Sequence, residues 1–369
     1  MKDRNRARRE RSREPNRDIL KSIAAGERGA AMWAVSVQEP DRLKLLQTEP
    51  PSPEPDEVLV RIGRAGICGS DMHIYRGKNP FARYPRVIGH EAMGRIEAIG
   101  ARVTGLAVGD RVVLDPVVSC GHCRACRVGR PNVCGNLAVI GVHRDGGMRE
   151  LAVFPAPNAI RVPEGLSDRA AVMAEPYSIA ANVTLRTEAN ENDIALIYGA
   201  GTVGLTVLQA FRMKQIPCVV TDIDDARLER AKKLGAARIV NSRNESLEQA
   251  VREETEGFGV TLVVDGAGAP GIIPQATKLA GPTGRIAVMN FAPGETPIEQ
   301  AEIVKKELSL VGSRLNRRLI PTVLRWFAEG LVDPDALVTH EFRYDQVLEA
   351  MRLIEEHPEQ TCKVHLIFS

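Results

Sequence analysis

The chain has 369 residues, of which 44% are hydrophobic and 26% charged, and its net charge at pH 7 is +2. These values are ordinary for a globular protein of about two domains, and they exclude a collagen, a coiled coil and a wholly disordered chain. The sequence contains no apolar run of 18 or more residues and no N-terminal apolar signal segment. We therefore expect a cytoplasmic protein that does not span a membrane.

Residues 1–31 carry ten Lys or Arg and five Asp or Glu, a net charge of +5, which leaves −3 for the other 338 residues. We expect this segment to be a disordered, solvated leader, and Met32, which stands before the first strand-like run, could be the true start. A basic leader could also bind an anionic surface. The slightly acidic remainder and the 4% aromatic content argue against nucleic acid as a partner.

Short strand-like runs separated by glycine and proline follow, at residues 57–62, 94–99 and 111–114. This rhythm is typical of an irregular β-rich domain, which we expect to span residues 32–177. Helical patterns at 319–329 and 344–356 and a last strand at 363–368 return to the same mixed texture. We therefore expect residues 313–369 to rejoin the first domain.

Four cysteines gather in a loop-like segment at residues 119–136, namely Cys120, Cys123, Cys126 and Cys134. Four thiolates complete the tetrahedral shell of Zn²⁺ and leave no open position, which predicts a structural zinc site. An iron–sulfur cluster and free thiols are the alternatives, but the last gap of seven residues differs from the ferredoxin spacing. Seven cysteines in total, an odd number with one tight cluster, favour metal ligation over disulfides.

From residue 193 onward, short apolar strands alternate with helical runs. The strands are expected at 194–198, 218–221, 238–241, 261–264, 285–289 and 308–312, and helices at 202–214, 226–234, 247–255 and 272–279. Buried strands alternating with helices are the pattern of a doubly wound parallel sheet. We expect this second domain, of the Rossmann type, to span residues 178–312.

A dinucleotide motif lies where the first of these strands meets its helix: Gly199, Gly201 and Gly204, with Thr202 and Val203 between them. The first glycine permits the tight turn, the second lets the backbone approach a pyrophosphate, and the third allows close helix–strand packing. Asp222, at the end of the next strand, is placed to bind ribose hydroxyls and to repel a 2′-phosphate, which favours NAD over NADP. Arg227 nearby weakens that preference slightly, and a Rossmann-like fold with an empty site is the alternative.

A second set of possible metal ligands lies in the first domain, where Cys68 precedes His90 and Glu91 by about twenty residues. Thiolate, imidazole and carboxylate together suit Zn²⁺. Alone, such a cysteine is more often core and such a histidine more often a satisfied polar residue. Their combination with the cysteine loop and the dinucleotide motif favours a catalytic metal site.

With these motifs the chain resembles the zinc-dependent medium-chain dehydrogenases, the family of alcohol, sorbitol and threonine dehydrogenases, over residues 32–369. The resemblance rests on residues 66–71, residues 89–91, the cysteine loop, residues 199–204 and Asp222. It implies an α/β protein in which a Rossmann domain is inserted into a GroES-like catalytic domain. It also implies zinc and NAD as cofactors, a small-molecule substrate, and a homodimer or homotetramer.

The resemblance further implies a catalytic zinc on Cys68 and His90, and it leaves open which of Glu91 and Glu175 touches the metal. Asp71 would hold His90. Ser70 would take the substrate proton and pass it through the cofactor ribose to His73. A plain turn hydroxyl is the alternative for Ser70, and an exposed surface residue is the alternative for His73.

Residues 175–184 and 312–316 are similar to a narrower branch of galactonate oxidoreductases and starvation-sensing dehydrogenases. Ile74 stands where sorbitol dehydrogenases carry a tyrosine, which argues against sorbitol. The resemblance implies NAD-dependent oxidation of a secondary hydroxyl in a polyol, a sugar acid or a similar small alcohol. Arg314 could bind a substrate carboxylate or lie on the surface.

Two other functions compete with this interpretation. A zinc-free reductase of the same fold would use NADPH and would not need Cys68 or His90. An NAD-sensing regulator without enzymatic activity would use the basic leader to bind nucleic acid, and its binding would be sensitive to salt.

Overall fold

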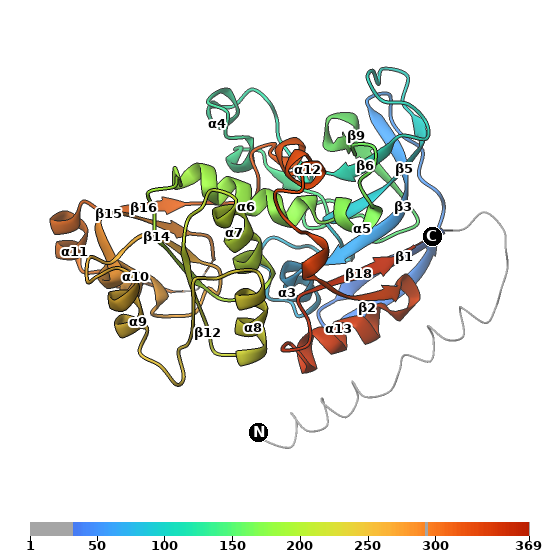
Figure 1. Ribbon diagram of the computed structural model, residues 1–369. Helices are drawn as coiled ribbons and strands as arrows, with labels where there is room; N and C mark the ends of the chain where they lie inside the picture. Colours follow the sequence, from blue (N-terminus) through green and yellow to red (C-terminus); the bar gives the residue numbers. More distant parts are fainter. Residues whose placement is uncertain (1–31, 292–293, 369) are drawn as a thin grey trace.

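The computed structural model describes residues 32–291 and 294–368, so the segment expected to be a leader lies outside the described residues. Two bodies lie side by side, each built on its own β-sheet, with helix α6 (Ala174–Arg186) between them (Figure 1). Within the described part, no helix combines the length and apolarity that a membrane crossing requires. The cytoplasmic location stays a prediction.

The β-rich body is built on a seven-stranded sheet in the order β10-β6-β5-β3-β18-β17, with β9 paired to β3. Its strands are β3 (Glu57–Ile67), β5 (Glu91–Ile99), β6 (Arg111–Leu114), β9 (Leu151–Pro155), β10 (Ala159–Arg161), β17 (Val338–Arg343) and β18 (Lys363–Ile367). The C-terminal strand β18 pairs antiparallel with β3. Strand β18 therefore lies beside the end of β3, the strand that leads into Cys68.

Smaller elements complete this body. A three-stranded sheet contains β2 (Arg42–Thr48), β1 (Met32–Glu39) and β4 (Arg86–Val87), and a two-stranded sheet contains β7 (Val117–Val118) and β8 (Ala138–Val139). The α-helices are α3 (Gly69–Tyr75), α4 (Arg124–Arg127), α5 (Asp168–Ala171), α12 (Ile320–Ala328) and α13 (Val347–Glu356). Single 3₁₀ turns lie at η1 (Pro131–Val133), η2 (Ala156–Asn158), η3 (Asp335–Leu337) and η4 (Tyr344–Gln346).

The second body is a six-stranded sheet, parallel throughout, in the order β13-β12-β11-β14-β15-β16. Its strands are β11 (Ala195–Tyr198), β12 (Cys218–Asp222), β13 (Arg238–Asn241), β14 (Val260–Asp265), β15 (Ala280–Val288) and β16 (Ser309–Gly312). Its helices are α7 (Thr202–Arg212), α8 (Asp225–Lys233), α9 (Leu247–Glu254), α10 (Ile272–Leu279) and α11 (Gln300–Lys306). This is the strand order of a dinucleotide-binding sheet, whose strand order reverses beside β11.

Helix α6 joins the two bodies through one continuous core. The core cluster around it contains Met93 and Val113 from the β-rich sheet together with Ile197 and Leu205 from the parallel sheet. Tyr177 on α6 is fully buried in the same cluster. The expected boundary between residues 177 and 178 therefore falls inside this helix, and the division into domains stays a prediction.

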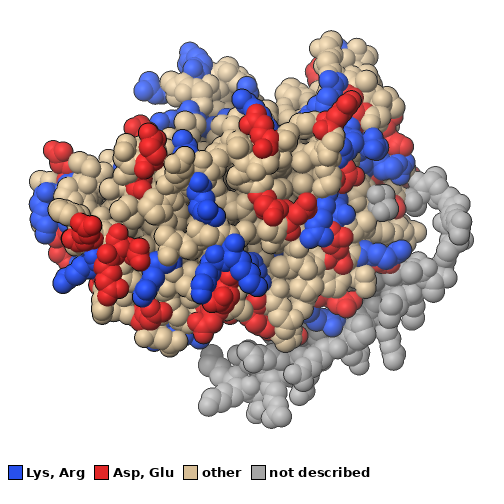
Figure 2. Space-filling model, in the orientation of Figure 1, with Lys and Arg blue, Asp and Glu red and all other residues tan. Residues whose placement is uncertain are grey.

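Charges of both signs are interspersed over the face of the molecule shown in Figure 2. Several of them pair across elements, for example Arg111 with Asp168 and Arg169 with Glu341. The face shown is therefore not the broad basic face on which nucleic-acid binding depends. The expected absence of nucleic acid as a partner stays a prediction.

Candidate functional site

The site begins where β3 ends and α3 starts. Cys68 occupies the N-cap position of α3, and its backbone N–H donates to Asp71 Oδ2 at 2.9 Å. The other carboxylate oxygen of Asp71 accepts the N–H of Gly89 at 3.2 Å. Asp71, which is completely buried, therefore fastens the turn that carries Cys68 to the segment that delivers His90.

The His90 ring has a polar neighbour near each nitrogen, although its buried Nδ1 makes no hydrogen bond among the described residues. Its Nδ1 lies 3.6 Å from Asp71 Oδ1, and its Nε2 lies 3.4 Å from Ser70 Oγ. Burial opposes a positive charge on this ring, but the nearby Asp71 and Cys68 outweigh it and raise the pKa of His90 well above its ordinary value. An imidazole in such surroundings attracts a proton, or a cation in place of the proton.

Glu91 follows at the start of β5 and forms a buried ion pair with Lys363, the first residue of β18. The Lys363 ammonium lies 2.6 and 2.8 Å from the two carboxylate oxygens and also donates to the Ile67 carbonyl at 3.3 Å. Both side chains are about 2% exposed. A side chain at Gly66 would overlap Glu91 Oε2, so the glycine makes room for this carboxylate.

Glu175 lies in the first turn of α6 and is 5% exposed. Burial raises the pKa of Glu175 to about 7, with His90 opposing the shift and Glu91 reinforcing it. Among the described residues, its carboxyl group has no hydrogen-bond partner. It is therefore a buried acid that gains much from a nearby cation.

The donor set fits a zinc ion. One ligand atom each from Cys68, His90 and Glu91 lie within 4.8 Å of one another, whereas Glu175 is outside that group. Sulfur, imidazole nitrogen and carboxylate oxygen are the ligands of catalytic zinc sites, which keep one position open for water or substrate. The structure thus brings the three residues together, and their role as ligands stays a prediction.

The predicted proton path is only partly assembled. Ser70 Oγ faces His90 Nε2, as described above, and Ser70 is half-buried. His73 lies one turn further along α3 and is exposed to solvent. Among the described residues, no hydrogen bond joins the side chains of Ser70 and His73.

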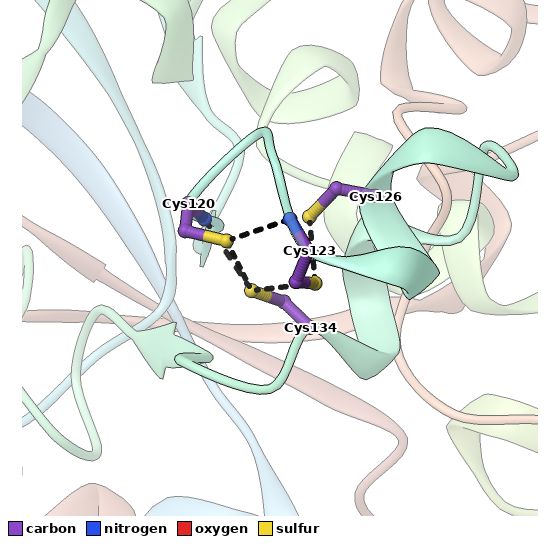
Figure 3. A group of neighbouring side chains, drawn as sticks. All are labelled: Cys120, Cys123, Cys126 and Cys134. Carbon is purple, nitrogen blue, oxygen red and sulfur yellow. Dashed lines mark hydrogen bonds between the residues drawn. The ribbon is translucent and has the colours of Figure 1, made fainter.

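The four cysteines of the loop converge on one point (Figure 3). Their sulfurs lie 3.4 Å (Cys120 to Cys134), 3.5 Å (Cys123 to Cys126) and 3.8 Å (Cys123 to Cys134) apart. Sulfurs around a tetrahedral zinc ion with bonds near 2.3 Å are about 3.8 Å apart. The backbone N–H groups of Cys126 and Gly135 lower the pKa of Cys123 to about 6, which favours the thiolate that a metal binds.

The dinucleotide motif has the expected turn. Gly199 adopts a φ of +90°, and a side chain at Gly204 would overlap the Gly199 carbonyl oxygen. Asp222 Oδ2 accepts the N–H of Ala200 at 2.7 Å. Gly201 precedes α7 and has open space around its Cα, so a phosphate can approach the helix N-terminus there.

Other residues of the predicted cofactor site make contacts between the two bodies. Thr202 Oγ1 donates to the Cys362 carbonyl at 2.8 Å, and the Arg227 guanidinium donates to the Pro358 carbonyl at 3.3 Å. Val203 is half-buried in the first turn of α7. Arg227 is thus engaged by the segment before β18, and its role toward a cofactor stays a prediction.

Sequence reasoning did not identify Lys363 as part of this site. The signal was present, because Lys363 opens a run that is otherwise almost entirely apolar, and charged residues are rarely fully buried unless they are paired. The sequence could not show which carboxylate pairs with Lys363. Glu91 is 272 residues away, and the pairing of β18 with β3, the neighbour of β5, brings the two together.

Comparison with known proteins defines the class. Residues 54–164 match the family model of the alcohol dehydrogenase GroES-like domain, and residues 202–329 match that of zinc-binding dehydrogenases. The chain belongs to the zinc-binding dehydrogenases of the alcohol dehydrogenase type. The expected α/β fold with a GroES-like and a Rossmann domain is confirmed, as is an oxidoreductase of the alcohol and polyol dehydrogenase class.

Individual relatives cover nearly the whole chain. The starvation-sensing protein RspB of Escherichia coli K12 is 46% identical over 342 residues, covering 92% of this chain and 100% of that protein. L-galactonate-5-dehydrogenase of the same organism is 32% identical over 321 residues, 87% of this chain and 94% of that protein. A crystal structure of rspB from E. coli CFT073, described as a short chain alcohol dehydrogenase complexed with NADH, has a TM-score of 0.89 at 45% identity, covering 92% of this chain and 100% of that one.

The expected zinc and nicotinamide dinucleotide cofactors are confirmed at the level of this family, whereas the preference for NAD over NADP stays a prediction. The matched model is that of zinc-binding dehydrogenases, and the rspB crystal structure holds NADH. The similarity to RspB and to the galactonate dehydrogenase also agrees with the narrower branch that residues 175–184 and 312–316 indicated.

Proposed function

We propose that the protein oxidises a secondary hydroxyl of a polyol, a sugar acid or a similar small alcohol, with NAD as hydride acceptor and in a zinc-dependent reaction. The observation that carries this proposal is the approach of Cys68 and His90, whose ligand atoms lie within 4.8 Å of each other in a chain that also has a dinucleotide turn.

Cys68 and His90 would hold the metal, and Glu175 would complete the set. Glu91 already has an ammonium group on both of its oxygens, whereas Glu175 is buried without a hydrogen-bond partner among the described residues. Glu175, whose carboxylate has no hydrogen-bond partner, is therefore the better metal ligand, although Glu91 lies closer to Cys68 and His90. A zinc ion bound there supplies the Lewis acidity that lowers the pKa of an alcohol.

The protein's own side chains orient the ligands and move the proton. Asp71 faces His90 Nδ1, so it favours the tautomer whose Nε2 lone pair is available to a metal. Ser70 Oγ stands beside that nitrogen and is the proposed first acceptor of the substrate proton. His73 is three residues further on α3, on the same side of the helix and exposed, and is proposed to release the proton to solvent.

The proposal is tested by a screen of alditols, aldonates and amino alcohols with NAD and, separately, NADP, with the metal content of the same sample measured. We expect NAD reduction with at least one polyhydroxylated alcohol and two zinc ions per chain. Cys68→Ser should abolish turnover and remove one zinc while leaving the fold intact. Cys218→Ala, a change at a buried cysteine of β12, is the control and should retain both zinc ions and most of the activity.

Turnover retained in Cys68→Ser, or a preference for NADPH with one zinc or none per chain, would contradict the proposal. The homodimer or homotetramer that the resemblance implies also stays a prediction. We include it in this proposal because β16 is an edge strand that could pair with the same strand of a second copy, and its Leu310 is 36% exposed.

A further inference from the structure

A cavity of about 250 Å³ lies between the cysteine loop and the parallel sheet. Its walls come from that loop, from the last turn of α6, and from the segments that follow β15 and β16. Four of its lining residues are arginines, namely Arg130, Arg186, Arg314 and Arg317. Among the described residues, no Asp or Glu lines this arginine cavity, and neither do the candidate metal ligands or the glycines of the dinucleotide turn.

The guanidinium groups of the arginine cavity have unused hydrogen-bond donors. Arg186 Nε donates to the Gly312 carbonyl at 3.0 Å, and Arg317 Nε donates to the Gly129 carbonyl at 3.2 Å. In the described part of the chain, their terminal nitrogens have no acceptor, the other two guanidinium groups have none at all, and no carboxylate lies within ion-pair distance of the four. Two groups are therefore oriented by the backbone, and all four keep N–H groups for a ligand.

The arginines repel one another across the cavity. Burial and the charges of Arg130 and Arg317 lower the pKa of Arg186, whereas Glu188 acts in the opposite direction. Like charges that gather in a partly buried place destabilise the folded protein, and a bound anion removes that repulsion. An anion with two negative charges removes more of it than an anion with one.

Contacts between separate elements build the cavity before a ligand arrives. The guanidinium carbon of Arg314 lies 5.4 Å from the ring centroids of both Phe81 and Phe291, so it is sandwiched between two aromatic rings. The Arg314 carbonyl accepts Asn132 Nδ2 of the cysteine loop at 2.7 Å and Asn182 Nδ2 of α6 at 3.3 Å. The backbone that carries Arg314 is therefore fixed in advance, which lowers the entropic cost of binding a ligand there.

We propose that the arginine cavity binds a phosphate group, carried by inorganic phosphate or by a phosphorylated small molecule, at a site separate from the metal and the dinucleotide. A guanidinium group matches phosphate geometry because it donates two parallel N–H bonds to a pair of oxygens. A phosphate monoester carries a charge between about −1.5 and −2 at pH 7, which suits a site with several cations.

Bound phosphate would tie three elements together, because the cysteine loop, the end of α6 and the segment after β16 each contribute at least one arginine. We therefore expect phosphate to stabilise the folded protein as well as to bind it. The inference does not depend on the proposed function, since it involves neither the alcohol nor the candidate metal ligands.

The test is isothermal titration calorimetry on the zinc-loaded protein with saturating NADH, which keeps the dinucleotide site occupied. Inorganic phosphate, glycerol 3-phosphate and acetate are compared at constant ionic strength. The variants are Arg130→Gln and Arg186→Gln in the cavity, Arg127→Gln as a matched control, and Cys68→Ser. Arg127 carries the same charge on the same loop but does not line the cavity, and Cys68→Ser removes a candidate metal ligand.

We expect one phosphate group per chain, bound at least about 10-fold more tightly than acetate, since acetate has one charge and fewer oxygens. Arg186→Gln should weaken phosphate binding about 10-fold, the effect of losing a hydrogen bond to a charged group. Arg130→Gln should weaken it about 3- to 10-fold, because Arg130 is more exposed. Arg127→Gln and Cys68→Ser should change it by less than about twofold.

The two phosphate ligands identify the natural source of the group. Tighter binding of glycerol 3-phosphate than of inorganic phosphate would support a phosphorylated small molecule, and the reverse order would support free phosphate. The thermal midpoint of the unaltered protein should rise with either ligand, and it should rise less in Arg130→Gln. Arg130 has no side-chain partner among the described residues, so its replacement tests the cavity even if Arg186→Gln fails to fold.

An absence of phosphate binding, or equal affinities for phosphate and acetate, would overturn this inference. Binding that is unchanged in Arg130→Gln and Arg186→Gln would place the anion elsewhere on the protein and would also overturn it. Binding that is lost in Cys68→Ser but kept in the two cavity variants would place the anion at the candidate metal site instead.

Discussion

At the scale of single residues, the buried ion pair between Glu91 and Lys363 should be costly to break, because both side chains are about 2% exposed. Lys363→Met would leave the Glu91 carboxylate buried without its cation, and we expect the free energy of unfolding to fall by about 3–5 kcal/mol. The double variant Lys363→Met with Glu91→Leu should recover most of that loss, because it removes both charges. Urea unfolding followed by circular dichroism measures both variants.

A change within 1 kcal/mol of the unaltered protein in Lys363→Met would mean that Glu91 has another partner, or that it is protonated. Glu91→Leu alone should also destabilise the protein, since it leaves the Lys363 ammonium unpaired. The coupling between the two residues follows from the three variants as a double-mutant cycle.

The candidate site shows what single residues reveal in a sequence and what they do not. Cys68, His90 and Glu91 could be found because their side-chain chemistry is typical of zinc and their spacing is compact. The choice between Glu91 and Glu175 could not be made, since it depends on which carboxylate already has a cation. That information resides in the packing of β18 against β3, which no local pattern encodes.

At the scale of elements, the cysteine loop at residues 119–136, called the lobe below, should act as a separate metal-stabilised unit. The four sulfurs lie within 4.8 Å of one another, three of the pairs at 3.4–3.8 Å, so they repel one another when ionised. The loop that carries them has little secondary structure to hold them together. Cys126→Ser should therefore remove one zinc per chain and lower the thermal midpoint by several degrees. Differential scanning calorimetry with metal analysis checks both quantities.

Cys68→Ser serves as the comparison for the lobe, since it should remove one zinc with a smaller change in thermal midpoint. An unchanged midpoint in Cys126→Ser would show that the lobe does not need its metal to fold.

Strand β18 carries a buried histidine that should make stability depend on pH. Burial lowers the pKa of His365 well below its ordinary value, and the cations Lys363, Arg64 and Arg169 reinforce the shift. Below about pH 6.5, His365 binds a proton in the unfolded chain but stays neutral in the folded protein. The free energy of unfolding therefore falls as the pH drops below about 6.5, and His365 alone contributes about 1.4 kcal/mol per pH unit to this fall. Above about pH 6.5, His365 makes no contribution to the pH dependence.

His365→Asn should reduce this acid-side slope by the same amount. Urea unfolding at pH 7.5, 6.0 and 5.0 for both proteins isolates the contribution, because other titrating groups are common to the two. Parallel slopes would show that His365 is protonated in the folded state.

The strands and helices of the parallel sheet could be predicted well because each is a buried apolar run between turn residues. Strand β13 and helix α10 fall at the residues expected, and the other predicted elements of this body differ mainly at their ends, but helix α11 was not predicted. Helix α6 was not predicted, because it is buried nearly all round and lacks the apolar stripe of a surface helix. Strand β17 was missed because only one of its six residues is buried.

At the scale of the whole molecule, the cofactor helix and the metal ligands are linked by a short path of contacts. Thr202, in the first turn of α7, donates to the carbonyl of Cys362, whose neighbour Lys363 holds Glu91. Gln209 on α7 exchanges two further hydrogen bonds with the backbone of Asp333, on the opposite body. A dinucleotide bound at the N-terminus of α7 thus lies against the same segment that orders the metal site.

The central claim is that this chain holds a zinc ion on Cys68 and His90, beside a bound dinucleotide. It is tested most directly by an anomalous difference map, collected at the zinc absorption edge, from crystals of the active enzyme grown with NADH. We predict two peaks per chain, one among the four cysteines of the lobe and one within bonding distance of Cys68 Sγ, a His90 ring nitrogen and a Glu175 oxygen. A fully active enzyme with a peak at the lobe and none near Cys68 and His90 would contradict the account.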